Sequence, residues 1–189
     1  GVTMARLYGE RIMLREYQKE DLPLIREWVN NPAITGFLSD IFLFPHTLVE
    51  TESYLNGRLE NNNPTSKGFV IAAIDTGAYL GQIDFTDIDW KNRKAMFGIV
   101  LGREENLSRG YGSDAIGVLL RFAFREMGLN RVGLDVKDNN ARGIACYRKC
   151  GFREEARMRD DYYQDGKYGD TIRMSILRRE WEAREERKA

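Results

Sequence analysis

Residues 103–113 read REENLSRGYGS and stand between an expected strand and an expected helix. Apolar residues from 116 to 127 recur at i, i+3, i+4, i+7, i+8 and i+11, which predicts an amphipathic helix over 112–127. Gly110 and Gly112 lie at its start, where missing side chains let main-chain amides approach an anion and the helix terminus adds about half a positive charge. The segment therefore predicts an anion-binding loop. The alternative is a plain helix start at which glycine relieves a tight turn.

The pattern Gly110-x-Gly112-x-x-Ala115 also matches a dinucleotide-binding fingerprint. In that fingerprint the glycines follow their strand almost at once, whereas here roughly seven residues intervene. Antiparallel strands are also expected before the loop. A nicotinamide enzyme is therefore a poor fit.

The flanking sequence predicts the other elements. Alternating or Val- and Ile-rich runs predict strands at 11–17, 69–75, 79–88, 95–101, 132–136, 152–163 and 168–177. Helical spacing and capping residues predict helices at about 20–30, 47–60 and 140–149, with a charged, solvated helix at 178–189. The resulting order, βααβββαβαββ, is a meander of strands followed by one β-helix-β crossover. It predicts a single α/β (α+β) domain over 1–189, with a mixed, mostly antiparallel seven-stranded sheet and helices on both faces.

Composition limits the classes of function. The 189 residues are 42% hydrophobic and 31% charged, which is enough apolar material for a core. The 29 Lys and Arg balance the 29 Asp and Glu, which disfavours a nucleic-acid partner. No apolar run approaches the roughly 18 residues that span a bilayer, and the start lacks a signal-peptide pattern. We expect a soluble, cytoplasmic protein without a membrane partner, which starts at Met4 after a cloning scar at 1–3.

Histidine and cysteine are scarce. His46 is the single histidine, it stands beside Pro45 in a loop-like stretch, and no Gly-x-Ser-x-Gly motif occurs. A Ser-His-Asp triad is therefore disfavoured, and no metal site is expected. Cys146 and Cys150 fall on one face of an expected helix, where geometry disfavours a disulfide, so we expect two reduced, half-buried thiols.

A second motif lies at 136–152, which reads VKDNNARGIACYRKCGF. Together with RGYGSDA at 109–115 it resembles the GNAT acetyltransferase superfamily, because two motifs in this order are far more specific than either alone. The segments at 12–15 and 165–170 also resemble this family, so the resemblance covers nearly the whole chain. Within the superfamily, the chain looks most like the branch of ribosomal-protein N-terminal acetyltransferases and spermidine N-acetyltransferase.

The resemblance implies acetyl-CoA as donor, an amine as acceptor and self-association as a homodimer. It implies that one strand pairs its backbone with the pantetheine arm, that the glycine loop cradles the diphosphate, and that an asparagine after the next strand adds a contact. It also implies that Tyr147 donates a proton to the departing thiolate. The cofactor-binding positions are thus Ile99, Val100, Leu101, Leu107, Ser108, Arg109, Gly110, Tyr111, Gly112, Ser113 and Asn140, with Arg142 as a further candidate for the CoA phosphates or a member of a solvated face.

The chain departs from the family pattern at two positions. Leu107 stands where the loop often begins with Gln or Arg, but main-chain amides would still serve the diphosphate. Met96 stands where the branch often carries a glutamate on the fourth strand, so a carboxylate that might have acted as a base there is absent. The candidates for the base are three aspartates on other strands, Asp84, Asp87 and Asp135, of which Asp84 and Asp135 are preferred, and a water relay is the alternative. Asn140 also has an alternative role, as a helix N-cap.

Two classes of function stay open. The first is an N-acetyltransferase that acts on a peptide N-terminus, a polyamine or another small amine such as an aminoglycoside. The second is an acyl-CoA-binding module without catalysis, for which Met96 is the argument. Tyr147 favours the enzyme.

Overall fold

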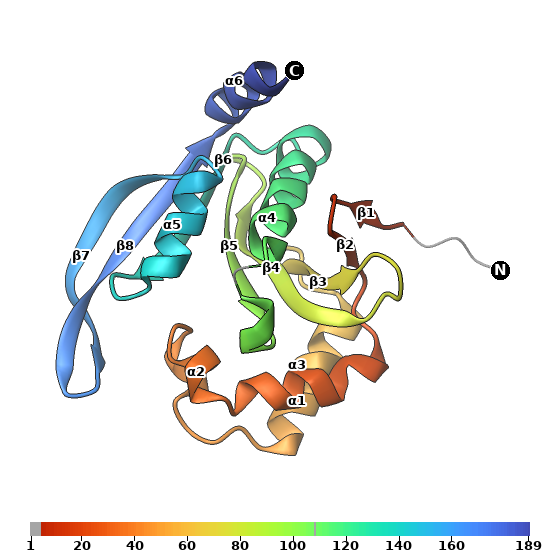
Figure 1. Ribbon diagram of the computed structural model, residues 1–189, viewed down its shortest axis with the longest axis vertical. Helices are drawn as coiled ribbons and strands as arrows, with labels where there is room; N and C mark the ends of the chain where they lie inside the picture. Colours follow the sequence, from red (N-terminus) through yellow and green to blue (C-terminus); the bar gives the residue numbers. More distant parts are fainter. Residues whose placement is uncertain (1–4, 108) are drawn as a thin grey trace. The chain divides into compact units, whose positions relative to one another are not determined.

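The computed structural model describes residues 5–107 and 109–189 (Figure 1). The strands are β1 (Leu7–Tyr8), β2 (Ile12–Arg15), β3 (Lys67–Ala73), β4 (Tyr79–Asp89), β5 (Lys94–Leu101), β6 (Arg131–Lys137), β7 (Arg153–Gln164) and β8 (Lys167–Leu177). The α-helices are α1 (Leu22–Val29), α2 (Pro32–Thr35), α3 (Leu48–Glu60), α4 (Tyr111–Arg121), α5 (Ala141–Lys149) and α6 (Arg178–Lys188). Short 3-10 turns are η1 (Lys19–Asp21), η2 (Asp40–Phe42) and η3 (Glu104–Asn106), and a π-helical turn, η4 (Phe122–Glu126), continues α4.

The strands are ordered β1-β2-β3-β4-β5-β6-β8-β7 in one sheet. β5 and β6 are parallel, and every other pair with a defined register is antiparallel. The mixed, mostly antiparallel sheet is therefore confirmed. The expected count of seven strands is wrong, because β1 adds an eighth at the edge. A strand of two residues is too short to show a period in the sequence.

A carboxylate far along the chain holds the turn between β1 and β2. Asp114, in the first turn of α4, accepts hydrogen bonds from the main-chain amides of Glu10, Arg11 and Ile12 at 3.2, 2.8 and 3.0 Å. Gly9 gives this carboxylate room, since a Cβ there would lie 2.4 Å from an Asp114 oxygen. A negative charge is also favoured at a helix N-terminus. Asp114 thus ties the first hairpin to the start of α4.

We expect Asp114→Asn to lower the free energy of unfolding by about 1–3 kcal/mol, the usual effect of leaving main-chain donors without a charged acceptor. Urea unfolding followed by circular dichroism measures this change. The matched control is Glu52→Gln on the exposed side of α3, which should change stability by less than about 0.5 kcal/mol. Equal stability of the two variants would contradict the role of Asp114.

The chain forms two compact units, and β4, β5 and α4 each run from one into the other. The first unit holds residues 1–85 and 98–118. Its core packs Ile25, Trp28 and Val29 of α1 with Leu55 of α3 against buried strand residues such as Val70. Each such side chain contributes about 1.5–3 kcal/mol through its burial. The apolar spacing of α1 and the Thr47–Glu50 capping box that starts α3 both agree with the sequence.

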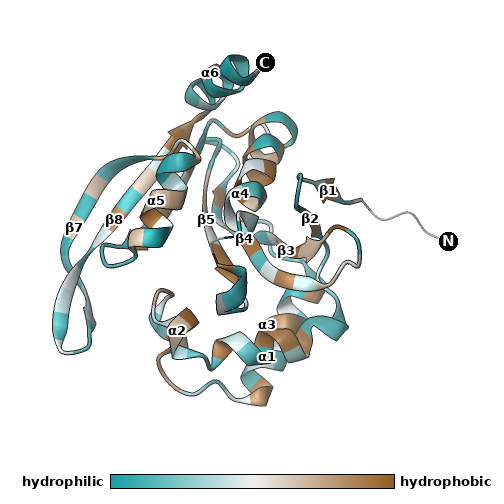
Figure 2. Ribbon diagram, in the orientation of Figure 1, coloured by the Kyte–Doolittle hydropathy of each residue, from teal (hydrophilic) through white to brown (hydrophobic). Residues whose placement is uncertain are grey.

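The second unit holds residues 86–97 and 119–189. Its long β7–β8 hairpin turns at Asp165 and Gly166, both with positive φ, as the sequence predicts. The expected charged C-terminal helix is α6, which is hydrophilic over most of its surface (Figure 2). Trp181 departs from that pattern, because its ring is buried with its centroid 5.4 Å from that of Phe124. No helix in the described ranges is both long and apolar enough to cross a bilayer.

Candidate active site

The expected anion-binding loop leads into α4. Gly110 has a φ of +79°, a left-handed conformation that glycine adopts without strain. The first main-chain bond of the helix runs from the amide of Asp114 to the carbonyl of Gly110 at 3.1 Å. Helix geometry therefore leaves the amides of Tyr111 and Gly112 without an intrahelical acceptor. This end of the helix can bind an anion through main-chain N–H groups.

Two arginines lie beside this loop. Arg109 is exposed, and its Nε donates to the carbonyl of Glu105 at 2.9 Å. Arg11 donates from its guanidinium to the carbonyl of Arg109 at 3.1 Å, and its Cδ and Nε lie 3.7 Å from where a Gly110 Cβ would stand. Arg11 is a candidate phosphate ligand that sequence reasoning missed, because it lies 98 residues before its partner. Both cations add positive charge next to the helix start.

The predicted loop residue Leu107 has a packing role. It is half-buried against the core cluster that contains Tyr17, Trp28 and Tyr79. An apolar side chain at this position thus anchors the loop to the first unit, which accounts for the departure from the Gln or Arg of the family pattern. Ser108, also predicted to contact the diphosphate, lies outside the described residues. Ser113 donates from its hydroxyl to the carbonyl of Gly110 at 3.2 Å.

The end of β5 carries the residues expected to meet the pantetheine arm. Ile99, Val100 and Leu101 are all half-buried, and Val100 packs against the same core cluster. In the described part of the chain, parallel pairing with β6 covers only Lys94–Met96, so these three residues lie beyond it. β4 approaches from its other edge so closely that a Cβ on Gly81 would lie 2.1 Å from the carbonyl oxygen of Val100.

Asp84 of β4 lies in a buried polar cluster of the first unit. Its Oδ1 accepts a hydrogen bond from the Tyr17 hydroxyl at 2.5 Å, and its Oδ2 accepts from the Gln82 amide at 3.4 Å. The guanidinium Nε of Arg58 lies 3.8 Å from Oδ1. Asp84 is 8% exposed, so the carboxylate relies on these partners rather than on water.

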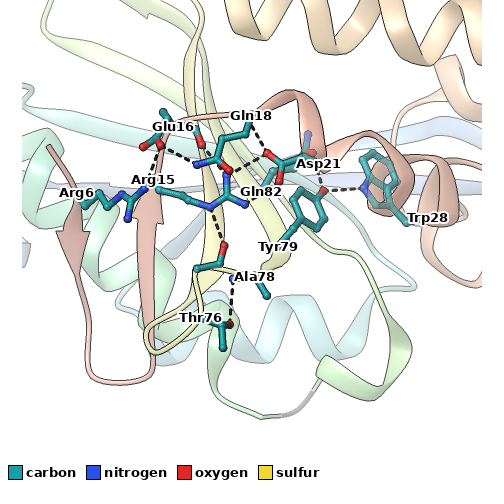
Figure 3. Close-up of polar contacts among 11 residues, drawn as sticks. Arg6, Arg15, Glu16, Gln18, Asp21, Trp28, Thr76, Ala78, Tyr79 and Gln82 are labelled. Atoms are coloured by element: carbon teal, nitrogen blue, oxygen red, sulfur yellow. Dashed lines mark hydrogen bonds and ion pairs between the residues drawn. The ribbon is translucent and has the colours of Figure 1, made fainter. Parts of the chain in front are cut away.

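A chain of hydrogen bonds fixes Gln82 beside this carboxylate. The Trp28 indole donates to the Tyr79 hydroxyl at 2.8 Å, and that hydroxyl donates to the Gln82 side-chain carbonyl at 2.8 Å (Figure 3). The Gln82 amide nitrogen in turn donates to the Tyr54 hydroxyl. The orientation of the Gln82 amide is thereby set, with its NH₂ group toward Asp84.

Burial determines the charge state of this cluster. It raises the pKa of Asp84 to about 6, although Arg58, Tyr17 and Gln82 each act to lower it. Burial and the charge of Asp84 also raise the pKa of Tyr17 well above its usual value. Burial disfavours the Arg58 cation, but Asp84 and the two tyrosines, Tyr17 and Tyr54, outweigh it and raise the pKa of the guanidinium. At neutral pH the cluster thus holds one carboxylate, one guanidinium and neutral phenols.

Gly68 of β3 gives Asp84 its space. The two residues are partners across the β3–β4 ladder. A Cβ on Gly68 would lie 1.6 Å from Asp84 Oδ1, so any side chain there would displace the carboxylate.

The other candidate base, Asp135, has a different environment. It is exposed on β6 and accepts two hydrogen bonds from Arg173 of β8, at 2.8 and 2.9 Å. A carboxylate held in a two-pronged pair with arginine is a weak proton acceptor. The geometry therefore favours Asp84 over Asp135 as a base.

Tyr147 lies on α5 in the second unit. Its ring packs edge-on against Phe97 and Phe152, with centroids 6.4 and 6.3 Å apart. Burial raises the pKa of its hydroxyl, and the neighbouring Cys146 and Cys150 add to the rise. No hydrogen-bond partner of this hydroxyl occurs among the residues that the structure describes. Tyr147 is therefore a neutral phenol, whose hydroxyl can donate a hydrogen bond to an incoming anion.

The remaining predicted residues lie in α5 or at its ends. Asn140 is its N-cap, and its Oδ1 accepts from the amide of Gly143 at 2.9 Å, which leaves its NH₂ group for another partner. Arg142 is exposed. Cys146 and Cys150 are half-buried thiols that form no disulfide, and a hydrogen bond from Cys150 lowers the pKa of Cys146 to about 7.

Comparisons with known proteins show which proteins this chain is similar to. A family profile described as "Acetyltransferase (GNAT) domain" matches residues 11–153. The chain is 26% identical over 179 residues to a spermidine N(1)-acetyltransferase of Vibrio cholerae, covering 94% of this chain and 99% of the relative. It is 35% identical over 106 residues to the putative ribosomal N-acetyltransferase YdaF of Bacillus subtilis, covering 56% and 57%. A crystal structure of spermidine N-acetyltransferase from Vibrio cholerae with CoA and spermine superposes with a TM-score of 0.78 at 26% identity, covering 90% of this chain and 97% of that one.

Proposed function

This chain belongs to the GNAT acetyltransferase family, and we propose that it transfers the acetyl group of acetyl-CoA to a primary amine by direct attack on the thioester. The observation that carries the proposal is the start of α4, where Gly110 turns the chain and the amides of Tyr111 and Gly112 have no intrahelical acceptor. A diphosphate supplies the anion that such amides bind. The arginines Arg11 and Arg109 add charge at the same place.

The donor would lie along residues already described. The loop from Leu107 to Ser113 binds the diphosphate, the main chain of Ile99, Val100 and Leu101 pairs with the pantetheine arm, and Asn140 and Arg142 add polar contacts. A main-chain amide near Leu101 stabilises the oxyanion of the tetrahedral intermediate, because a positioned donor is worth most where negative charge develops.

The reaction requires two proton transfers. An ammonium group has no lone pair, so the acceptor must lose a proton before its nitrogen attacks the thioester carbon. Asp84, or a water molecule that it orders, takes this proton. When the C–S bond breaks, the CoA thiolate, with a pKa of about 8.5 by analogy with cysteine, takes a proton from Tyr147. The products are the acetylated amine and CoA thiol.

The acceptor is a primary amine of a peptide N-terminus, a polyamine or another small amine such as an aminoglycoside. Named relatives include a spermidine acetyltransferase and a putative ribosomal acetyltransferase, and both acceptor classes belong in the test. The family resemblance also leads us to propose a homodimer and a cytoplasmic location. Size-exclusion chromatography with light scattering tests the former.

The decisive experiment measures thiol release from acetyl-CoA with a panel of amines, beside calorimetry of acetyl-CoA binding. We expect donor binding, and thiol release that depends on an amine. A second candidate function, a non-catalytic acyl-CoA-binding module, is favoured by Met96 at the position of the family glutamate. Donor binding without thiol release for any amine would establish that second function, and absence of donor binding would overturn both.

A further inference from the structure

The buried polar cluster around Asp84, which also includes Tyr17, Tyr54 and Gln82, contains a cation, Arg58. Arg58 of α3 has a side chain that is 18% exposed, and its Nε lies 3.8 Å from Asp84 Oδ1. Its guanidinium carbon lies 5.9 Å from the ring centroids of both Tyr17 and Tyr54. A carboxylate with two aromatic rings is the set of groups that binds an ammonium ion. Arg58 therefore occupies surroundings that suit a cationic ligand.

The resident guanidinium changes the charge of the cluster. Asp84 contributes one negative charge and Arg58 one positive charge, so the pair is neutral before any substrate arrives. The other buried acidic side chain that the structure describes in this unit, Asp21, is already paired with Arg15 at 2.7 Å. A second ammonium group of a polyamine would thus meet a guanidinium rather than a carboxylate, and like charges brought together in a poorly solvated place repel strongly.

Arg58 also has N–H groups that can donate hydrogen bonds to a ligand. A guanidinium carries five N–H groups, and one of them donates to the Ser66 hydroxyl at 3.2 Å. The side chain is held by Ser66, Tyr54 and Asp84, so its remaining donors are oriented in advance. A carbonyl or carboxylate group on the carbon that bears the reacting amine would find a charged hydrogen-bond donor there, as such oxygens do at arginine.

We infer that Arg58 is a specificity-determining residue, which selects an acceptor with a single amine and a carbonyl or carboxylate group attached to the carbon that bears the amine, and which disfavours polyamines. The inference rests on the proposed function, because it requires the acceptor amine to approach Asp84. Free amino acids and peptide N-termini share this chemistry.

The experiment compares kcat/KM for four acceptors. Alanine and a dipeptide both carry a carboxylate or carbonyl group on the carbon that bears the amine. Propylamine lacks this group, and spermidine adds further positive charges. We expect the wild type to prefer the better of alanine and the dipeptide over both propylamine and spermidine by about tenfold or more. The order of alanine and the dipeptide identifies whether a carboxylate or a peptide carbonyl is recognised, and either order supports the inference.

Two variants separate specificity from structure. Arg58→Gln should lower kcat/KM for the preferred acceptor about tenfold and raise it for spermidine, whereas Arg58→Lys, which keeps the charge, should still disfavour spermidine. Arg6→Gln is the matched control, because Arg6 pairs with Glu16 at 3.2 Å in the same unit, outside the donor loop, and its replacement should leave all four values unchanged. Calorimetry should give the same acetyl-CoA affinity for every variant.

The outcomes are distinguishable. A wild type that prefers spermidine, or an Arg58→Gln variant with an unchanged ratio of dipeptide to spermidine, overturns the role of Arg58 and leaves the acetyltransferase intact. An Arg58→Gln variant that loses activity toward all acceptors equally, while Arg58→Lys restores all equally, shows a structural role only and also overturns it. Donor binding without acetylation of any amine in the wider panel overturns the proposed function itself.

Discussion

Asp84→Asn is expected to lower kcat by about 100- to 10,000-fold, the range that a general base contributes, while the affinity for acetyl-CoA stays unchanged. The variant keeps the size of the side chain and an oxygen that the Tyr17 hydroxyl can reach, but it cannot take a proton from the acceptor ammonium group. Steady-state thiol release gives kcat, and calorimetry gives the donor affinity. A decrease in kcat of less than about threefold would remove Asp84 from the mechanism.

The pH dependence identifies this carboxylate. Burial raises the pKa of Asp84 to about 6, so the wild-type kcat/KM should fall as the pH drops through about 6, where the base becomes protonated. The Asp84→Asn variant should lack this limb. Arg58, Tyr17 and Gln82 face the carboxyl group, and none of them changes protonation in this range.

As the pH rises, the contribution of Asp84 to the free energy of unfolding should fall while the activity rises. A folded-state pKa above the unfolded value of about 4 means that the folded protein binds the proton more tightly. The free energy of unfolding therefore decreases, through this group, as the pH rises from about 4 to about 6, and the deficit persists above 6. Asp84→Asn removes this deficit, so it should be at least as stable as the wild type at pH 8 although it is inactive. If the carboxylate had only a structural role, Asp84→Asn would instead be less stable than the wild type at pH 8 and would stay active.

Two further variants sharpen the test. Gly68→Ala leaves the carboxylate in the chain but puts a methyl group 1.6 Å from the present position of its Oδ1, so the kcat of this variant should also fall, by at least about tenfold. Asp135→Asn is the matched control, because that carboxylate is exposed and paired with Arg173. Its kcat should stay within about threefold of the wild type.

The sequence could place Asp84 on a strand but not in a cluster. Alternation along β4 puts Gln82 and Asp84 on one face. Two polar side chains on the same face of a strand that also carries apolar residues are a signal that can be read from the sequence. Their partners Tyr17, Tyr54 and Arg58 come from separate segments, so no local spacing brings them together. For the same reason Asp84 and Asp135 look alike in the sequence, and the structure distinguishes them by the burial of Asp84 and by the pairing of Asp135 with Arg173.

Features that depend on residues close together in the sequence could be predicted, whereas contacts between distant segments could not. The glycine loop, the start of α4 and the Asp165–Gly166 hairpin follow from φ preferences and helix geometry within a few residues. By contrast, β1 depends on Asp114, whose carboxylate binds amides about one hundred positions earlier. Arg11 escaped notice for the same reason, since only the fold brings it beside Gly110.

Tyr147→Phe is expected to lower kcat roughly 10- to 1000-fold, again without a change in acetyl-CoA affinity. The ring would keep its packing against Phe97 and Phe152, so only the hydroxyl is lost. The raised pKa of that hydroxyl keeps it protonated throughout the working pH range, ready for the thiolate. Thiol release under saturating donor and acceptor measures the effect.

The matched control is Tyr163→Phe, which removes a hydroxyl from a tyrosine that is 65% exposed on the β7–β8 hairpin. Its kcat should equal that of the wild type. Tyr147→Phe should also retain the acid limb near pH 6 that Asp84 produces, because the two groups act on different protons. Unchanged turnover in Tyr147→Phe, with the control behaving as expected, would mean that the thiolate leaves without a proton from this phenol and that water or solvent-borne acid supplies it instead.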